Sequence, residues 1–409
     1  MVDPSFRKRH RVVSDAETLL VPEFWRWGMG YEMTVLTVSS AKPICRFTDL
    51  PDCYNPINAC DGFLLIASRV KHLPLYVCNP VTGEKLKIPA PPKIEHILWR
   101  MYAMGYSPST REYKLFRLSF ENQGWPNTED THLDVYTLGS SDGEWRRQPC
   151  QFSYCDAYGI HSPPPVLIDG KLYVLMGRRR MPDRVLVIDV ASEVQCTYRL
   201  PEVFTGEHLT EDLTGDGKQV ATTVHAFELR GQLCVALRFV GWPRLCFWVM
   251  PSLRGRRLCD DSNHTWLLGW ERRYTFYVDI KNDNNNQPCG AWLNKNMLCY
   301  RLGDLVYKYD TTKPMQKHKH ILEWDYQNQL HYDVQWSVHG GYRPSLLSPH
   351  LAFESAPLLQ QHRYEQEDCE QALVHAALCC DKWCSTCIPD LSTHPIRPAK
   401  RYRRPTNDS

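Results

Sequence analysis

The densest group of metal-ligating side chains lies near the end of the chain. It comprises Cys379, Cys380, Cys384 and Cys387, with His375 and His394 nearby. Structural zinc usually takes four nitrogen or sulfur ligands as two close pairs separated by a loop. Cys384 and Cys387 form one such pair, and Cys380 would need Cys379, Cys369 or a histidine to form the second. The alternative, which we favour, is a buried stripe of cysteines on a helix, so that Cys380, Cys384 and Cys387 are weak zinc candidates and no cofactor is expected.

The common catalytic motifs bear on whether this chain is an enzyme. The sequence contains no Gly-x-Ser-x-Gly elbow, no His-Glu-x-x-His and no Gly-x-x-x-x-Gly-Lys-Ser/Thr loop. His318 and His320 lie two apart in KHKHIL, with His331 further on. Two such histidines on one strand face can bind a metal ion, but an exposed strand face is the commoner explanation. We therefore expect a protein that is not an enzyme.

The sequence contains basic and aromatic clusters of the kinds that can bind nucleic acid. Basic runs occur at 7–11, 178–180 and 400–404, and FWRWGMGY (24–31) interleaves aromatic with small residues. KRYRRP could be a nuclear localisation signal or a solvated tail. Aromatic rings could stack on bases, but core packing is the favoured explanation for them. Because Lys+Arg 48 against Asp+Glu 46 leaves a net charge of only +2, nucleic acid is not an expected partner.

The cysteine content indicates a reduced compartment. The chain of 409 residues has 17 cysteines, an odd number, and no apolar signal segment at its start. Reduced thiols in a cytoplasmic or nuclear protein are the better interpretation. Cys78, Cys234, Cys246 and Cys299 lie inside strand-like apolar runs, where a thiol behaves as a small hydrophobe. No apolar run reaches the roughly 18 residues of a membrane span, so no membrane is expected.

The central part of the sequence reads as β-structure. Short apolar runs alternate with clusters of Gly, Pro, Asp and Asn; examples are LYVCNP (75–80), KLYVLM (171–176), VLVIDV (185–190), QLCVALRF (232–239), RLCFWVM (244–250), YTFYVDI (274–280) and DLVYKYD (304–310). Many short strands with turn signals between them predict a sandwich, a barrel or a propeller.

Repeats decide among these architectures. A strand, a polar turn and a second strand recur, with turns entered at positions 79, 137, 189, 250 and 310. A second kind of hairpin, with a polar-Gly-polar turn before an apolar strand, recurs as DGKLYVLM (169–176) and RGQLCVALRF (230–239). Two hairpins per repeat make one four-stranded propeller blade. We therefore predict an all-β propeller of about six blades, with seven blades or a large β-sandwich as the alternatives.

Three regions are predicted along the chain. Residues 1–44 are a lead-in segment, residues 45–353 form the propeller domain, and residues 354–409 form an amphipathic helix and a polar basic tail. The helix is predicted from the helical spacing of apolar and small residues in RYEQEDCEQALVHAALCCDKWC.

A series of short segments, in order along the chain, carries a resemblance to a known family. The segments are CDGFLLI (60–66), LYVCNPVTGEKLKIPAPP (75–92), GYSPSTREYKLFRL (105–118), LDVYTLGSSDGEWRRQ (133–148), PPVLIDGKLYVLM (164–176), VLVIDVASE (185–193) and LRGQLCVALR (229–238). They resemble the F-box-associated domain of plant F-box proteins. The resemblance implies a substrate receptor that binds a target protein, while a preceding F-box docks onto the Skp-type adaptor of a cullin-RING ubiquitin ligase.

The start of the sequence departs from the family pattern. The resemblance implies that DPSFRKRH (3–10) closely follows an F-box, and residues 11–44 supply no replacement for that module. We therefore expect this chain to bind its target, and to bind a Skp-type adaptor only if an F-box is restored upstream. A truncated gene model or an alternative start would also explain the pattern. The alternative function is a propeller-fold enzyme, a hydrolase or a metal-dependent oxidase.

Overall fold

The structure is a computed structural model of the chain. It describes residues 17–23, 33–37, 43–47, 54–68, 73–94, 97–122, 129–140, 142–148, 150, 164–177, 182–201, 222–239, 244–253, 269–277, 288–294, 296–302, 305–312 and 335–353. The chain divides into two units, Met1–Ser355 and Ala356–Ser409, and all the described residues lie in the first.

The described strands form six sheets, which we call A to F. Sheet A combines strands from both ends of the unit, in the order β23 (Gln335–Tyr342), β1 (Glu17–Glu23), β2 (Met33–Thr37) and β3 (Pro43–Phe47). Sheet B contains β4 (Tyr54–Cys60), β5 (Phe63–Ser68), β6 (Leu75–Cys78) and β7 (Lys85–Ile88). Sheet C contains β8 (Ile97–Ser107), β9 (Glu112–Asn122), β10 (Glu129–Thr137) and β11 (Arg146–Gln148).

The remaining sheets follow the same up-and-down order. Sheet D contains β12 (Val166–Ile168), β13 (Lys171–Met176), β14 (Arg184–Asp189) and β15 (Gln195–Arg199). Sheet E contains β16 (Thr222–Leu229), β17 (Gln232–Phe239), β18 (Arg244–Val249) and β19 (Glu271–Tyr277), and sheet F contains β20 (Pro288–Asn294), β21 (Met297–Leu302) and β22 (Leu305–Asp310). The one described helix, α2 (Pro349–Phe353), follows β23.

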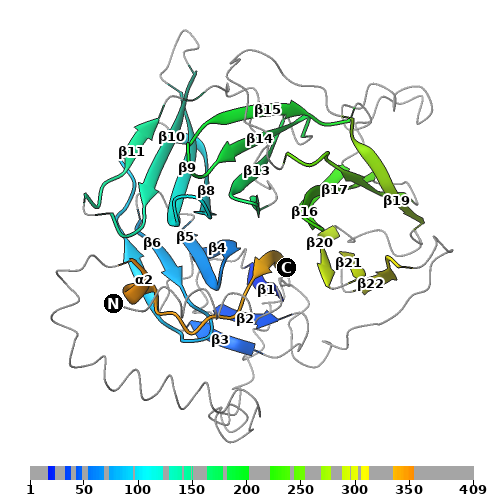
Figure 1. Ribbon diagram of the computed structural model, residues 1–409, viewed down its shortest axis with the longest axis horizontal. Coiled ribbons are helices and arrows are strands. Elements are labelled where there is room, and N and C mark those ends of the chain that lie inside the picture. Colours follow the sequence, from blue (N-terminus) through cyan, green and yellow to red (C-terminus); the bar gives the residue numbers. More distant parts are fainter. Residues whose placement is uncertain are drawn as a thin grey trace, which may run out of the picture. The chain divides into compact units, whose positions relative to one another are not determined.

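Each sheet packs between two neighbours. Five apolar clusters fill the junctions A/B, B/C, C/D, D/E and E/F, and β20 of sheet F contacts β23 of sheet A. In Figure 1 the strands β8, β16 and β20 lie nearer the centre around which the sheets are arranged than β11, β19 and β22 do. With both faces covered, a strand can be apolar throughout, and every residue of β5, FLLIAS, is buried. This packing explains why the sequence shows continuous apolar runs.

Sheet A joins the two ends of the unit. Strand β23 pairs antiparallel with β1, with Leu19 opposite His339, Val21 opposite Ser337 and Glu23 opposite Gln335. Next to this sheet, the Asn58 side chain of β4 donates to the Met104 carbonyl of β8 and accepts from the Met104 N–H, both at 2.8 Å. The Asn58 amide therefore provides the inner edge of β8 with the partner that a further strand would supply.

Much of the predicted fold is confirmed. The described part is all-β apart from α2, and strands lie at each of the seven runs named above. The number of blades stays a prediction, and the C-terminal helix predicted within 354–409 lies outside the described residues. Strands β1 and β2 fall in the segment assigned to a lead-in, yet they form sheet A with β23. Within the described part, no helix is long and apolar enough to cross a membrane.

The closing strand β23 carries a buried histidine. His339 is 2% exposed, and burial lowers its pKa to about 4, a shift that a hydrogen bond with the Ile57 backbone of β4 only partly opposes. An ordinary histidine titrates near 6.5. The folded protein therefore holds His339 neutral in a pH range in which the unfolded chain takes up a proton.

We predict that acid weakens the fold through His339. Because the pKa of His339 is lower in the folded state, its contribution to the free energy of unfolding is complete above pH 6.5 and is lost as the pH falls towards 4. The loss reaches about 2 kcal/mol at pH 5. Urea unfolding of the wild type and of His339→Gln at pH 7.5 and pH 5.0 measures this. Between the two pH values the free energy of unfolding of the variant should fall by about 2 kcal/mol less than that of the wild type. An equal decrease in both proteins would contradict the assignment.

Candidate interaction face at the turn end of the sheets

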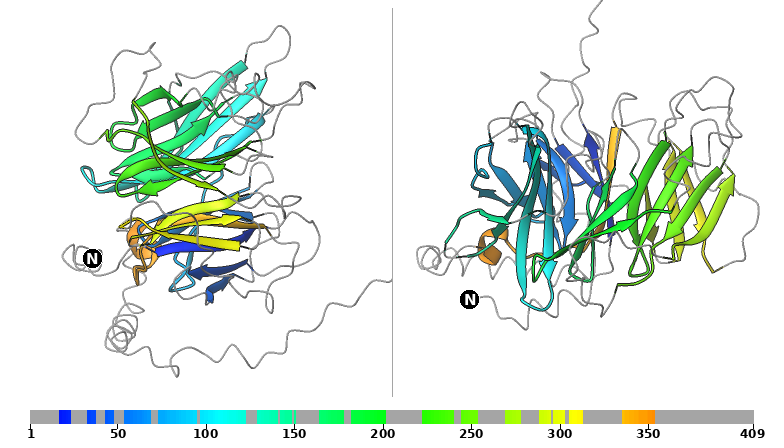
Figure 2. Two further views of the ribbon diagram at one scale, coloured as in Figure 1. Left: turned by 90° about the vertical axis from the view of Figure 1, so that its right-hand side faces the viewer. Right: turned by 90° about the horizontal axis from the view of Figure 1, so that it is seen from above.

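One end of the strands carries the short hairpin turns, and we call it the turn end. In the right-hand view of Figure 2 the strands run roughly up and down between two ends. The turns Asp61–Gly62, Asp169–Gly170 and Arg230–Gly231 each join the first and second strand of a sheet, and both residues of each turn have positive φ. Two-residue turns of this kind match the twist of antiparallel strands. The polar-Gly turns predicted at 169 and 230 are confirmed.

A second set of turns lies at the same end, after the third strand of sheets B, D and F. The side chains of Asn79, Asp189 and Asp310 accept hydrogen bonds from the N–H groups two residues later, at 2.8, 3.0 and 3.0 Å. Short polar side chains stabilise turns in this way. These are three of the positions at which the sequence repeat enters its turn, so the repeat corresponds to a recurring structural position.

Residues 343–353, which follow β23, run across the turn end of sheet B, and we call them the strap. The Asn79 side chain donates to the carbonyls of Ser345 and Leu347 at 2.7 and 2.8 Å. A Cβ atom at Gly62 would lie 2.5 Å from the Ser345 Cβ. The strap therefore requires both the asparagine and the glycine at these turns.

The strap ends in an aromatic seat between sheets B and C. The ring of Phe353 lies 4.9 Å from that of Phe63 and 5.1 Å from that of Tyr113, and its side chain is 6% exposed. The Phe353 carbonyl oxygen would lie 3.3 Å from a Cβ atom at Gly139. The turn end thus already binds one segment of the chain, whose Ser345 and Leu347 carbonyls accept hydrogen bonds and whose Phe353, at the end of helix α2, enters a junction.

The next junction, C/D, is closed by charged groups. The Lys114 ammonium donates to Glu193 at 2.8 Å and to the Ala191 carbonyl at 3.0 Å, and Arg146 donates to Glu193 at 2.8 Å. Burial raises the pKa of Glu193, but the hydrogen bonds from Arg146 and Lys114 outweigh it, so that the net pKa is lowered. Glu193 therefore stays ionised and links the two sheets.

A second buried ion pair lies within sheet C. Arg117 and Asp134 are directly opposite on β9 and β10, are 1% and 0% exposed, and are joined by two hydrogen bonds of 2.9 and 2.6 Å. Arg147 of β11 donates to the other carboxylate oxygen of Asp134 at 3.1 Å. Arg117 also donates to the Pro92 carbonyl at 2.8 Å, so this network connects sheet C to the segment that leaves sheet B.

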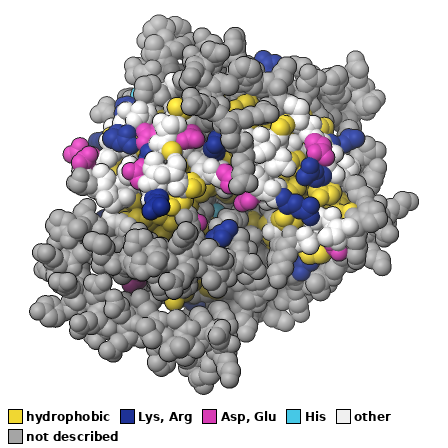
Figure 3. All heavy atoms as spheres, in the orientation of Figure 1, with side chains coloured by type: hydrophobic (Ala, Val, Ile, Leu, Met, Phe, Trp, Pro, Cys, Tyr) yellow, Lys and Arg dark blue, Asp and Glu magenta, His cyan; other side chains and the backbone are white. Residues whose placement is uncertain are grey.

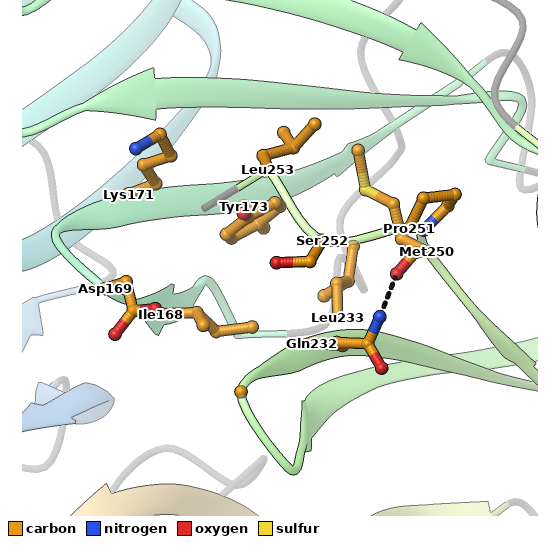
Figure 4. Close-up of a pocket in the computed structure, with 11 residues that line it drawn as sticks. Ile168, Asp169, Lys171, Tyr173, Gln232, Leu233, Met250, Pro251, Ser252 and Leu253 are labelled. Atoms are coloured by element: carbon orange, nitrogen blue, oxygen red, sulfur yellow. Dashed lines mark hydrogen bonds between the residues drawn. The ribbon is translucent and has the colours of Figure 1, made fainter. Parts of the chain in front are cut away.

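A small hollow lies at the turn end between sheets D and E. Its volume is ≈ 10 Å³ and its lining includes Tyr173, Leu233, Met250 and Leu253. Figure 4 shows Asp169 and Ile168 on one side of it and Met250 and Pro251 on the other, with the Gln232 amide donating to the Met250 carbonyl at 3.3 Å. Small-molecule sites usually measure hundreds of Å³, so this hollow suits one side chain rather than a substrate.

Charged and apolar groups alternate over the turn end. In Figure 3, where this end faces the viewer, acidic and basic side chains are interspersed with apolar ones across the described part. Such a mixture favours contact with a protein over attraction to a strongly charged polymer.

Several candidates from the sequence fall outside the described residues. They are the cysteines Cys369, Cys379, Cys380, Cys384 and Cys387, the histidines His318, His320, His331, His375 and His394, and the basic and aromatic clusters. Among the described residues no group of three or more His, Cys, Asp or Glu could hold a metal ion. Of the cysteines predicted in strands, Cys78, Cys234 and Cys299 are buried and Cys246 is partly buried.

The sequence reasoning missed the strap and the buried ion pairs. Asn79 appeared only as a turn residue, and nothing in a local pattern links it to Ser345. The sequence does contain one indication of the strap. After equivalent Asp-Gly turns, DGF (61–63) has an aromatic residue where DGK (169–171) has lysine.

Comparison with known proteins shows which family part of the chain resembles. A family model described as "F-box associated beta propeller domain" matches residues 36–211. This segment is similar to the associated domain of plant F-box proteins, and the relatives that match are F-box proteins. It is 22% identical over 280 residues to F-box protein At3g07870 of Arabidopsis thaliana, covering 63% of this chain and 60% of that protein. It is 34% identical over 138 residues to F-box protein At1g53790 of the same plant, covering 32% and 28%.

The match covers less than two thirds of the length of either relative. Among solved structures, the chain is similar to the Cps50 (Swd1) β-propeller domain of Myceliophteria thermophila, with a TM-score of 0.36, 9% identity and coverage of 72% of this chain and 81% of that one. Kluyveromyces lactis Hsv2 gives a TM-score of 0.31 at 10% identity, with coverage of 78% and 94%.

We predict that Asn79→Asp releases the strap while keeping the turn. The carboxylate can still accept from the Val81 N–H but cannot donate to Ser345 and Leu347, and the loss of buried hydrogen bonds should cost about 1–3 kcal/mol. Hydrogen exchange of residues 343–353 should become faster. Asp189→Asn changes the corresponding turn of sheet D and should leave exchange in the strap unchanged; equal effects of the two variants would contradict this role.

We predict that the two partners of Asp134 differ in energetic weight. Asp134→Ala leaves the Arg117 charge buried without its carboxylate and should lower the free energy of unfolding by about 3–5 kcal/mol. Arg147→Ala removes the half-exposed partner of the same carboxylate and should cost about 0–1 kcal/mol. Urea unfolding followed by tryptophan fluorescence measures both, and a cost for Arg147→Ala as large as that for Asp134→Ala would contradict the assignment.

Proposed function

We propose that this chain is the substrate-receptor part of an SCF-type, cullin-RING ubiquitin ligase and binds a target protein for ubiquitination. The match of residues 36–211 to the F-box-associated domain carries the proposal. The relatives named above are F-box proteins, which supports the same role here.

In this proposal the domain contributes proximity rather than acid–base chemistry. Holding a target near a reactive partner raises the effective concentration of the two groups. A rigid β scaffold whose short turns are fixed by hydrogen bonds suits recognition, because surface residues can change without loss of the core. The ≈ 10 Å³ hollow between sheets D and E is also too small for an ordinary substrate.

The partners follow from this role. The chain binds a target protein, and a Skp-type adaptor joins through an F-box placed before the associated domain. We place the protein in the cytoplasm, the nucleus or both, where such ligases and reduced cysteines belong. Without an F-box the same chain would shield its target rather than deliver it.

A three-way comparison in plant cells tests the proposal. The forms are the 409-residue chain, the same chain with an F-box fused before Met1, and that fusion with adaptor-contacting F-box residues changed to alanine. Proteins that co-purify with the first form should become ubiquitinated and depleted with the second. They should accumulate with the first and third, because the target is then bound without a ligase.

Two outcomes would count against the proposal. The co-purifying proteins would keep the same ubiquitination and abundance with all three forms if the chain were not a receptor. Recovery of the Skp-type adaptor with the 409-residue chain alone would contradict the part of the proposal that assigns adaptor binding to an added F-box.

A further inference from the structure

Junctions B/C and D/E are built alike at the turn end. In sheet C the Leu138 N–H donates to the Tyr113 carbonyl at 2.9 Å, and in sheet E the Met250 N–H donates to the Leu233 carbonyl at 2.8 Å. The indole of Trp145 donates to the Pro89 carbonyl at the end of sheet B at 3.0 Å. Trp270 makes the same link from sheet E to the Arg199 carbonyl of sheet D at 2.9 Å. The backbone at the two junctions can therefore be compared position by position.

This comparison relates the seat of Phe353 to the hollow between sheets D and E. The turns Asp61–Gly62 and Asp169–Gly170 occupy the same place in sheets B and D, between the first and second strands. Counting from these turns and from the two backbone hydrogen bonds named above gives three pairs of equivalent residues. They are Phe63 with Lys171, Tyr113 with Leu233, and Gly139 with Pro251. All three residues that surround Phe353 at B/C thus have counterparts that line the hollow at D/E.

The two junctions differ in what fills them. At B/C the aromatic ring of Phe353 fills the seat. At D/E, Leu253 from the segment after β18 is 4% exposed and packs in the cluster of Tyr173 and Leu233. It leaves a hollow of ≈ 10 Å³, about the size that a water molecule or a methyl group needs.

We propose that the D/E hollow is an anchor point for a partner polypeptide. It takes the tip of one aliphatic side chain, Val, Ile or Leu, from a segment that lies across the turn end of sheets D and E, as the strap lies across sheet B. This rests on the proposed function, since the segment would belong to the target protein.

The chemistry of the hollow fits this occupant. Its inner wall is apolar, formed by Ile168, Tyr173 and Leu233, and the buried Tyr173 has a raised pKa because burial disfavours its charged form. Around the mouth lie polar side chains of Lys171, Gln232 and Ser252. The Lys171 ammonium, which lies 3.7 Å from Asp189, and the second N–H of the Gln232 amide, whose first donates to Met250, can donate to the carbonyls of a bound backbone, as Asn79 does for the strap. The apolar side-chain tip of the bound segment would therefore contact the inner wall, while its backbone carbonyls would face the polar groups around the mouth.

A matched pair of variants tests the site. Ser252→Arg places a large side chain at the mouth of the hollow, and Ser140→Arg makes the same change at the equivalent position of junction B/C, two residues after the paired N–H. A displayed library of random 12-residue peptides is selected on the full chain, and each enriched peptide is titrated against the wild type and both variants. Thermal unfolding shows whether each variant stays folded.

We expect enriched peptides with one shared aliphatic position that bind Ser252→Arg at least 10-fold more weakly and Ser140→Arg within 2-fold of the wild type. Alanine at the shared position should weaken binding to the wild type about 4-fold, which corresponds to the loss of one buried methyl group. If Ser252→Arg unfolds, Leu253→Ala provides a second measurement. It enlarges the hollow, and the selected anchor should shift from Val or Leu to Phe.

Three results would overturn the proposal. Peptides that bind Ser252→Arg as tightly as the wild type would place recognition elsewhere and leave the receptor function standing. A shared anchor that is aromatic or charged on the wild type would reject the aliphatic occupant. Failure to enrich any peptide whose binding is weakened by Ser252→Arg would reject the site. The ubiquitination comparison above would still test the proposed function independently.

Discussion

The pairing of β23 with β1 is the constraint on which the rest of the arrangement depends. The other five sheets are built from strands that follow one another in the sequence, so each can form locally. Sheet A alone needs strands from both ends of the unit, with Leu19 opposite His339. Without it, faces of sheets B and F would lose their cover and strand edges would lie open. The entropy cost of joining distant residues rises only logarithmically with separation, so the junction clusters on either side can offset it.

The fold separates a turn end from an end that carries the longer connections. Hairpins at the turn end need only a few residues, whereas the longer connection from β15 of sheet D to β16 of sheet E leaves and enters the sheets at the other side. On one repeated backbone the junctions at the turn end carry different chemistry. Phe353 fills B/C, Lys114 and Glu193 bridge C/D, and Arg230 donates to Thr311 at 2.7 Å across E/F. Variation in surface chemistry therefore leaves the backbone intact.

How far the sequence predicts this structure depends on the range of the interaction. Local signals were sufficient for the strands, because apolar runs and the turn at Asp169–Gly170 are determined by neighbouring residues. The repeat at Asn79 and Asp189 also marked a true structural position. The strap was not predictable, since Asn79 acts on Ser345, 266 residues away. The ion pair of Arg117 with Asp134 needed the register of two strands, which depends on tertiary packing rather than on local pattern.

An anchor as small as the D/E hollow has a consequence for how a target is bound. Burying one methyl or methylene group contributes about 0.8 kcal/mol, and association must first overcome at least about 4 kcal/mol of lost motional freedom. The hollow alone therefore sets position and selects a side chain, and affinity must come from several contacts along the turn end. The strap uses the same arrangement within the chain: one buried ring at Phe353, two hydrogen bonds from Asn79 and a close approach at Gly62 act together. A target that spans more than one junction would gain affinity in the same way, by adding contacts whose positions the closed set of sheets already fixes.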